Sequence, residues 1–148
     1  MYVLDTNVVS RMSGPNPDNN VTNWLAGVND SDVFFSVVVI MELRKGIERE
    51  RKKKNADLAR LSASEQRLKE FVKSFWDHFI PADNDIAEEW GKLIGERDQD
   101  QADMLIAATA NVKHFTVVTR NVSHFENRVK NIIDPFKPVK TRMKKRGA

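Results

Sequence analysis

The sequence contains no cysteine, which excludes a disulfide framework and any thiolate that binds a metal or acts as a nucleophile. It has no apolar run close to the ~20 residues of a membrane-spanning helix. The N-terminus also lacks the basic region and the long apolar run of a signal peptide. For a chain of 148 residues without repeats or Pro-, Gly- or Ser-rich linkers, we expect one globular domain that is cytoplasmic and makes no membrane contact.

Acidic residues are missing from the end of the chain, where residues 137–148 hold six Lys or Arg. Residues 1–136 therefore carry a net charge of −3, although the whole chain carries +3. A second basic run, residues 44–54, holds seven basic and two acidic side chains, and residues 83–103 hold eight acids. Clustered Lys and Arg can follow a phosphate backbone. The plainer interpretation is a solvated helix face at 44–54 and a flexible basic tail at 137–148.

Short apolar segments alternate with helical patterns along the chain. Strands are expected at 2–4, 33–35, 79–80, 115–119 and 129–134, and helices at 18–28, 37–78, 86–97 and 101–112. Ser36, Asp85 and Asp100 are the expected N-caps of three of these helices, although residues 37–40 also fit a strand. The alternation predicts an α/β fold with a parallel sheet, in which the functional crevice lies at the carboxyl ends of the strands.

Residues 43–78 are expected to form a charged helical hairpin with one break, near Asn55 or near residues 62–64. An apolar stripe runs along this segment, and it consists of Leu61, Leu68, Phe71, Val72, Phe75 and Trp76. The stripe fits the core of the hairpin, which we favour for most of these residues, and it also fits part of a groove for a partner protein.

Asp5, Glu42 and Asp103 each stand alone in an uncharged stretch of at least ten residues. A carboxylate in an apolar stretch is costly to desolvate without a partner. Each has a plain explanation: Asp5 can cap a turn, Glu42 can lie at the edge of an apolar face, and Asp103 can compensate a helix dipole. Together, on three elements of one α/β crevice, they predict a hard-oxygen site suited to Mg²⁺ or Mn²⁺. His78, His114 and His124 have no metal-binding spacing and are expected to be ordinary residues.

Several segments in order resemble the PIN domain, and most closely a VapC-type toxin of a toxin–antitoxin pair. The matching segments are YVLDTNVVS at 2–10, VVVIMELRKGI at 37–47, ADMLIAATA at 102–110, VVTRNVSHF at 117–125 and NIIDPF at 131–136. The resemblance covers almost all of residues 1–136. It implies a three-layer α/β/α fold with a five-stranded parallel sheet.

The resemblance also implies a function, a Mg²⁺- or Mn²⁺-dependent endoribonuclease. Asp5, Glu42 and Asp103 would hold the metal ion, and a metal-activated water would cleave RNA. Thr6 and Asn7 would steady the turn at Asp5, and the Thr119 hydroxyl would point at the site. The family further implies a cognate antitoxin and a homodimer.

The chain departs from the family pattern just after the fourth strand. Many members carry another aspartate where this chain has Asn121, and some carry an acid where it has His124. Asn121 can orient a ligand or a water but adds no charge, so we expect one ion held by three carboxylates, with Asn121 as the fourth member of the catalytic set. A second ion arriving with the substrate, or partial replacement by Glu126, stays open.

Basic residues near this site are expected to guide RNA, and they are Arg44, Lys45, Lys52, Lys53, Lys54 and Arg120. Transfer RNA and ribosomal RNA are both open as targets. Two alternatives remain beside the toxin: a PIN nuclease for RNA processing that has no antitoxin, and an RNA-binding module with little or no catalysis.

Overall fold

The computed structural model describes residues 1–96 and 100–138, and its centre is a five-stranded parallel sheet. The strands are β1 (Tyr2–Leu4), β2 (Val33–Ser36), β3 (Phe79–Ile80), β4 (Thr116–Val118) and β5 (Ile132–Ile133). Their order across the sheet is β3-β2-β1-β4-β5, so both edge strands are only two residues long. In register, Val3 lies between Phe34 of β2 and Val117 of β4. The predicted sheet is confirmed.

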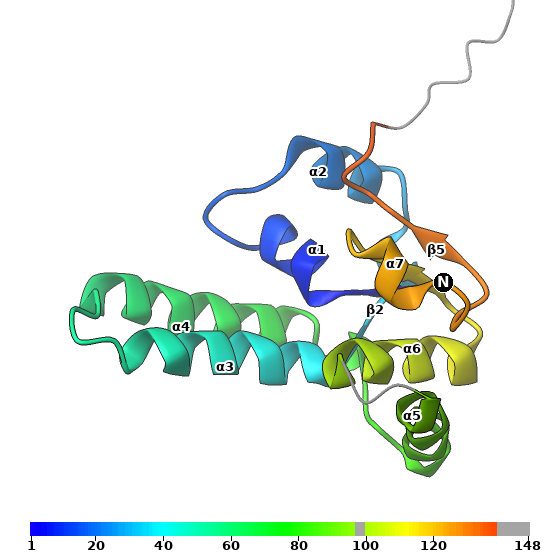
Figure 1. The fold of residues 1–148 in the computed structure, drawn as a ribbon. Coiled ribbons are helices and arrows are strands. Elements are labelled where there is room, and N and C mark those ends of the chain that lie inside the picture. The colour runs from blue at the N-terminus through cyan, green and yellow to red at the C-terminus, as the bar shows by residue number, and fades with distance from the viewer. Residues whose placement is uncertain (97–99, 139–148) are drawn as a thin grey trace, which may run out of the picture.

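Helices cover both faces of the sheet and form the outer two of three layers (Figure 1). The α-helices are α1 (Thr6–Met12), α2 (Asn19–Ala26), α3 (Val38–Arg51), α4 (Leu58–Ser74), α5 (Asn84–Glu96), α6 (Gln101–Lys113) and α7 (Val122–Phe125), and two 3₁₀ turns, η1 (Asp30–Asp32) and η2 (Trp76–His78), precede β2 and β3. None of the described helices is long and apolar enough to cross a bilayer.

The sheet separates two apolar cores, because neighbouring strand residues point to opposite faces. Val3 packs in the core that contains α5 and α6, whereas Leu4 packs in the core that contains α1, α2 and part of α4. In the second core Phe35 is fully buried, and its ring lies 5.0–5.4 Å from those of Phe71, Phe75 and Phe79.

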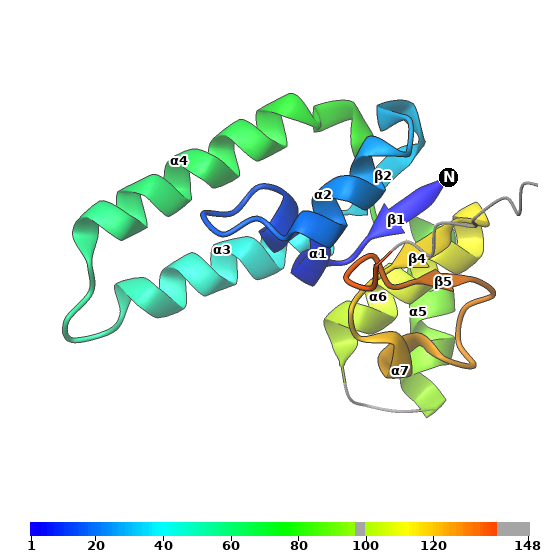
Figure 2. The ribbon, with the colours of Figure 1, turned by 90° about the horizontal axis from the view of Figure 1, so that it is seen from above.

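The predicted hairpin is the pair α3 and α4, which extends past the edge of the sheet (Figure 2). Its break lies between Arg51 and Leu58, where the Asp57 side chain accepts a hydrogen bond from the Arg60 backbone N–H. A small core of Ile47, Leu61 and Leu68 joins the two helices. Most of the apolar stripe is therefore core, but Trp76 at its end is 72% exposed.

Three predicted caps differ from the structure. Val37, not Ser36, occupies the N-cap position of α3, and the Ser36 hydroxyl accepts from the Val38 N–H at 3.4 Å. Helix α5 begins before Asp85, because the Asp83 carboxylate accepts from the Ile86 N–H at 3.0 Å.

Asp100 does precede α6, but it has a left-handed backbone (φ 60°) and its side chain makes no capping hydrogen bond. Residues 139–148 of the predicted tail lie outside the described residues.

Candidate active site

Asp5 follows β1 at the carboxyl edge of the sheet and is 2% exposed. Its backbone N–H donates to Val118 O at 2.9 Å, which fixes it beside the end of β4. Two side chains donate to its Oδ2, the Thr119 hydroxyl at 2.6 Å and the Asn7 amide at 2.7 Å. The carboxylate is therefore held in place by neutral donors, which leave its negative charge uncompensated.

Asn7 and Thr119 also tie together the two loops that carry them. Asn7 Nδ2 lies 3.3 Å from the Thr119 hydroxyl, and Asn7 Oδ1 accepts from the Arg120 N–H at 3.2 Å. The Asn121 N–H donates to the Thr119 hydroxyl at 2.9 Å. The residues that follow β1 and β4 thus form one connected polar network around Asp5, with Thr119 fully buried within it.

The pKa of Asp5 is raised to about 6, chiefly because burial disfavours its charged form. The negative charges of Asp103 and Glu42 also raise this pKa, while the hydrogen bond from Thr119 lowers it. The three acids that stand alone in the sequence therefore lie close enough for their charges to repel one another.

Glu42 comes from the second turn of α3, on the side of the helix that faces α1. Its Oε2 accepts a hydrogen bond of 2.5 Å from the Thr6 hydroxyl. Because Thr6 directly follows Asp5, this contact brings α3 to the turn that carries the buried carboxylate. Thr6 thus holds Glu42, while Asn7 holds Asp5.

Asp103 lies in the first turn of α6, and its Oδ2 is 2.6 Å from His124 Nδ1. Asp100, Asp103 and His124 form a group whose ligand atoms all lie within 4.8 Å of one another. Asp5, Glu42 and Asp103 do not form so compact a group in the described part of the chain. Asp5, Glu42 and Asp103 are each held by different neighbours. Asp103 is the one residue shared by the predicted trio of acids and the compact group that includes His124.

His124 and Asp100 are the site residues that the sequence did not reveal. From the sequence we predicted that His124 is an ordinary residue, because its spacing from the other histidines matches no metal-binding motif. The fold brings it to Asp103 across 21 positions of the chain. Two signals were available: His124 stands where some family members carry an acid, and Asp100 and Asp103 lie three residues apart at the start of a helix, a pair that also fits a cap and a dipole effect.

Two further predicted residues, Asn121 and Arg120, lie at the edge of the candidate site. The Asn121 side chain is exposed and makes no hydrogen bond within the described residues. The Arg120 guanidinium lies 5.2 Å from the centre of the Phe136 ring, so it packs on the segment after β5.

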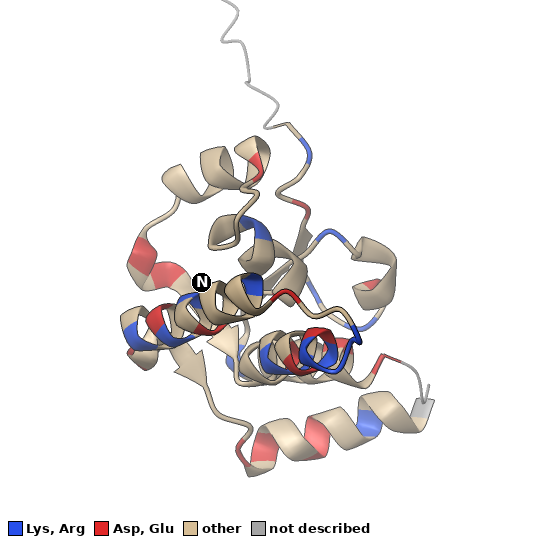
Figure 3. Cartoon of the chain, turned by 90° about the vertical axis from the view of Figure 1, so that its left-hand side faces the viewer, with Lys and Arg blue, Asp and Glu red and all other residues tan. Residues whose placement is uncertain are grey.

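The basic residues of the hairpin are partly neutralised (Figure 3). Arg44 pairs with Glu48 and Glu65, and Arg51 also pairs with Glu65, so these arginines link α3 to α4. Lys53 pairs with Glu50 at 2.5 Å. The predicted RNA contacts of the hairpin that have no ion pair among the residues that the structure describes are Lys45, Lys52 and Lys54.

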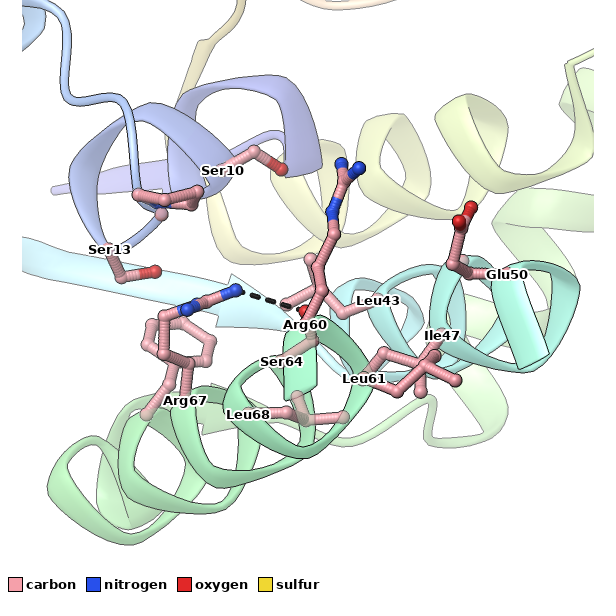
Figure 4. A pocket seen from close by; sticks show the side chains of 14 residues that line it. Ser10, Ser13, Leu43, Ile47, Glu50, Arg60, Leu61, Ser64, Arg67 and Leu68 are labelled. Carbon is pink, nitrogen blue, oxygen red and sulfur yellow. Dashed lines mark hydrogen bonds between the residues drawn. The ribbon is translucent and has the colours of Figure 1, made fainter. Parts of the chain in front are cut away.

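A groove of about 380 Å³ lies between the end of α1 and the hairpin (Figure 4). Its floor is apolar and includes Leu43, Leu61 and Phe71. Arg60 and Arg67 project from α4 along its wall, and Arg67 donates to the Ser64 hydroxyl at 3.0 Å. Ser10, which lines one end of the groove, lies on the same helix as Thr6 and Asn7.

The carboxylates in this arrangement fit a divalent cation. Asp5 is buried, its pKa is raised, and its neighbours in charge are two further acids. Carboxylate oxygens are the preferred ligands of Mg²⁺ and Mn²⁺, and a cation would relieve the repulsion among them. No ion pair joins Asp5 or Glu42 to a Lys or Arg of the described chain.

Comparison with known proteins places the chain among proteins of one family. The sequence matches the PIN domain over residues 2–129. The VapC ribonuclease Y4jK of Sinorhizobium fredii is 31% identical over 144 residues, which cover 93% of this chain and 99% of that protein. Toxin FitB of Neisseria gonorrhoeae is 33% identical over 133 residues, which cover 84% of this chain and 91% of that protein. The crystal structure of FitAcB from N. gonorrhoeae superposes with a TM-score of 0.76 at 27% identity, over 92% of this chain and 99% of that one.

Proposed function

This chain belongs to the PIN-domain family and is of the VapC type, and from that premise we propose that it is a metal-dependent endoribonuclease and the toxin of a toxin–antitoxin pair. The observation that carries the proposal is Asp5, a buried carboxylate with a raised pKa that lies beside two more acids at the end of a parallel sheet. The names of the relatives support the same activity, since one is a ribonuclease and another a toxin.

We propose that Asp5, Glu42 and Asp103 hold Mg²⁺ or Mn²⁺. When bound, such an ion would neutralise phosphate oxygens and would lower the pKa of a water molecule that serves as the nucleophile. The protein's own contribution is to place the ligands. Thr119 and Asn7 fix Asp5, and Thr6 fixes Glu42. Burial of Asp5 strengthens its attraction to a cation, because fewer waters screen it.

The test is expression of three forms in a bacterial host: wild type, Asp5→Asn and the matched control Asp30→Asn, an exposed residue of η1. We expect growth arrest and discrete new RNA ends with wild type and the control, and neither with Asp5→Asn. If all three forms give the same RNA ends, the nuclease proposal is wrong. RNA binding without cleavage under any metal would indicate the RNA-binding module instead.

We propose that the tip of the hairpin contacts the RNA backbone through lysines. Changing Lys52, Lys53 and Lys54 to Glu should weaken RNA binding and flatten its salt dependence, by about 0.7 in log–log slope for each lost phosphate contact. The binding constant of the Asp5→Asn form, measured by fluorescence anisotropy over a salt series, checks this.

A matched control places the same charge reversal at Lys73, Lys92 and Lys130, which are exposed on other elements. The control should keep the steeper slope. Equal slopes in the two triple variants would show that the hairpin tip is only a solvated face.

We propose that the groove beside α1 receives a segment of the antitoxin that has apolar side chains and at least one acid opposite Arg60 and Arg67. Solved relatives include FitAB bound to DNA and a toxin–antitoxin complex from Klebsiella pneumoniae. An apolar floor with two arginines along one wall is complementary to a segment of that chemistry.

The double variant Arg60→Glu, Arg67→Glu should still arrest growth but should escape neutralisation by a co-expressed cognate antitoxin. Its affinity for the antitoxin should fall by about 30-fold or more, since a charge pair across an interface is worth about 2 kcal/mol or more. The control Arg49→Glu, Lys73→Glu changes exposed residues outside the groove. If the antitoxin neutralises the Arg60→Glu, Arg67→Glu variant normally, the groove is not its binding surface.

A further inference from the structure

His124 is held firmly beside the acidic site by the backbone around it. It belongs to α7, whose last residue, Phe125, is fully buried in the core that contains α6. Its N–H donates to Asn121 O at 3.0 Å, and the Asn121 N–H in turn donates to the Thr119 hydroxyl. The position of the His124 backbone is therefore coupled to the residue that fixes Asp5.

The contact with Asp103 defines which nitrogen carries the proton. An ionised carboxylate only accepts hydrogen bonds, so His124 must donate from Nδ1 to Asp103 Oδ2. At 2.6 Å this bond is short, and the side chain of Asp103 is only 16% exposed. One carboxylate oxygen is thus occupied, and the orientation of the whole group is fixed while the other oxygen remains to act as a ligand.

From this geometry we propose that His124 is a positioning residue for the metal centre, which orients Asp103 through a hydrogen bond from Nδ1. The proposal rests on the proposed function, because Asp103 matters as a ligand only if the site holds a cation. Hydrogen bonds that orient ligands raise the affinity of metal sites, and their loss weakens binding by about 10- to 100-fold.

Two substitutions separate the hydrogen bond from the rest of the imidazole. In His124→Asn, the side-chain amide can donate from nearly the position of Nδ1, whereas in His124→Leu no donor remains. We expect the Mn²⁺ dissociation constant of His124→Leu to rise by about 10- to 100-fold, and that of His124→Asn to stay within about threefold of wild type. His114→Asn, at the exposed end of α6, is the control and should leave it unchanged.

The measurement is isothermal titration calorimetry of MnCl₂ into each purified protein without RNA, after circular dichroism has established that each is folded. The proposal is supported if His124→Asn keeps the wild-type affinity for Mn²⁺ and His124→Leu loses it. Equal affinities in Leu and wild type, or equal losses in Asn and Leu, overturn it. A wild-type protein that binds no Mn²⁺ would overturn the metal site itself, which is a separate failure of the proposed function.

Discussion

Replacing Asp5 with Asn should abolish RNA cleavage and, at the same time, stabilise the metal-free protein at neutral pH. Activity should fall on the order of 10³-fold or more, because loss of a metal ligand removes several kcal/mol of charge stabilisation in the transition state. Stability should rise because the amide has no charge to desolvate and no repulsion from Asp103 or Glu42. The amide oxygen can still accept from Thr119 and Asn7, so the fold is kept.

The pH dependence of this gain follows from the raised pKa of Asp5. The folded protein binds the proton of Asp5 more tightly than the unfolded chain does, so wild-type stability from this group is greatest at low pH. It is lost as pH rises from the ordinary pKa of 3.8 to the raised value of about 6. The difference between Asp5→Asn and wild type should therefore be near zero below pH ~4 and should reach about 3 kcal/mol at most above pH ~7.

Urea denaturation from pH 4 to 8 in the presence of a chelator measures this difference. Asp30→Asn should change stability by less than about 0.5 kcal/mol at every pH, as expected for an exposed substitution. Added Mn²⁺ should stabilise wild type but not Asp5→Asn, since only a form that binds the ion gains stability from it. A variant that is less stable than wild type at pH 8 would contradict the account of Asp5 as a buried, crowded carboxylate.

Replacing Phe35 with Ala should destabilise the protein by about 3–5 kcal/mol, enough to unfold many domains of this size. Phe35 is fully buried in β2, and three other phenylalanine rings surround it. Removing the ring leaves a cavity that the short β2 and β3 and the end of α4 cannot close without shifting the hairpin. The shift in urea midpoint at constant slope gives the magnitude.

Trp76→Ala is the control for this substitution, because Trp76 lies two residues after the end of α4 but is 72% exposed. It removes a still larger side chain and should cost less than about 0.5 kcal/mol. Similar losses in both variants would mean that the phenylalanine cluster does not anchor the hairpin.

The sequence predicted the sheet and most helices because apolar runs such as residues 115–119 are strong local signals. Of the two positions that the sequence allowed for the break in the hairpin, the one near Asn55 is correct, whereas residues 62–64 lie within α4. It placed the cap of α5 incorrectly, because Asp83 and Asp85 have similar capping propensity and tertiary packing chooses between them, and it began α3 one residue too early. The metal-binding roles of Asp5, Glu42 and Asp103, the role of Asn121, the RNA contacts, the homodimer and the identity of the ion stay predictions.

The site was only partly visible in the sequence for a physical reason. Asp5, Glu42 and Asp103 could be predicted as candidate ligands because isolated charges in apolar stretches are unusual, and their charges do lie close enough to interact. His124 could not, because its partner Asp103 is brought to it by the packing of α7 against α6, and no local pattern encodes that contact. Side-chain directions were equally invisible, so the sequence did not predict that Thr6 and His124 each hold one of the acids.

The two-residue strands at the margins of the sheet also matter for how this protein behaves at high concentration. An outer strand is a template on which another polypeptide can add its backbone, and long flat templates promote fibrils. Here β3 and β5 each offer only two residues, and Pro81 directly follows one of them while Pro135 follows the other within two residues. The edges of the sheet therefore offer few backbone groups on which another polypeptide could add a strand. Self-association of this protein should proceed through helix surfaces and not by extension of the sheet.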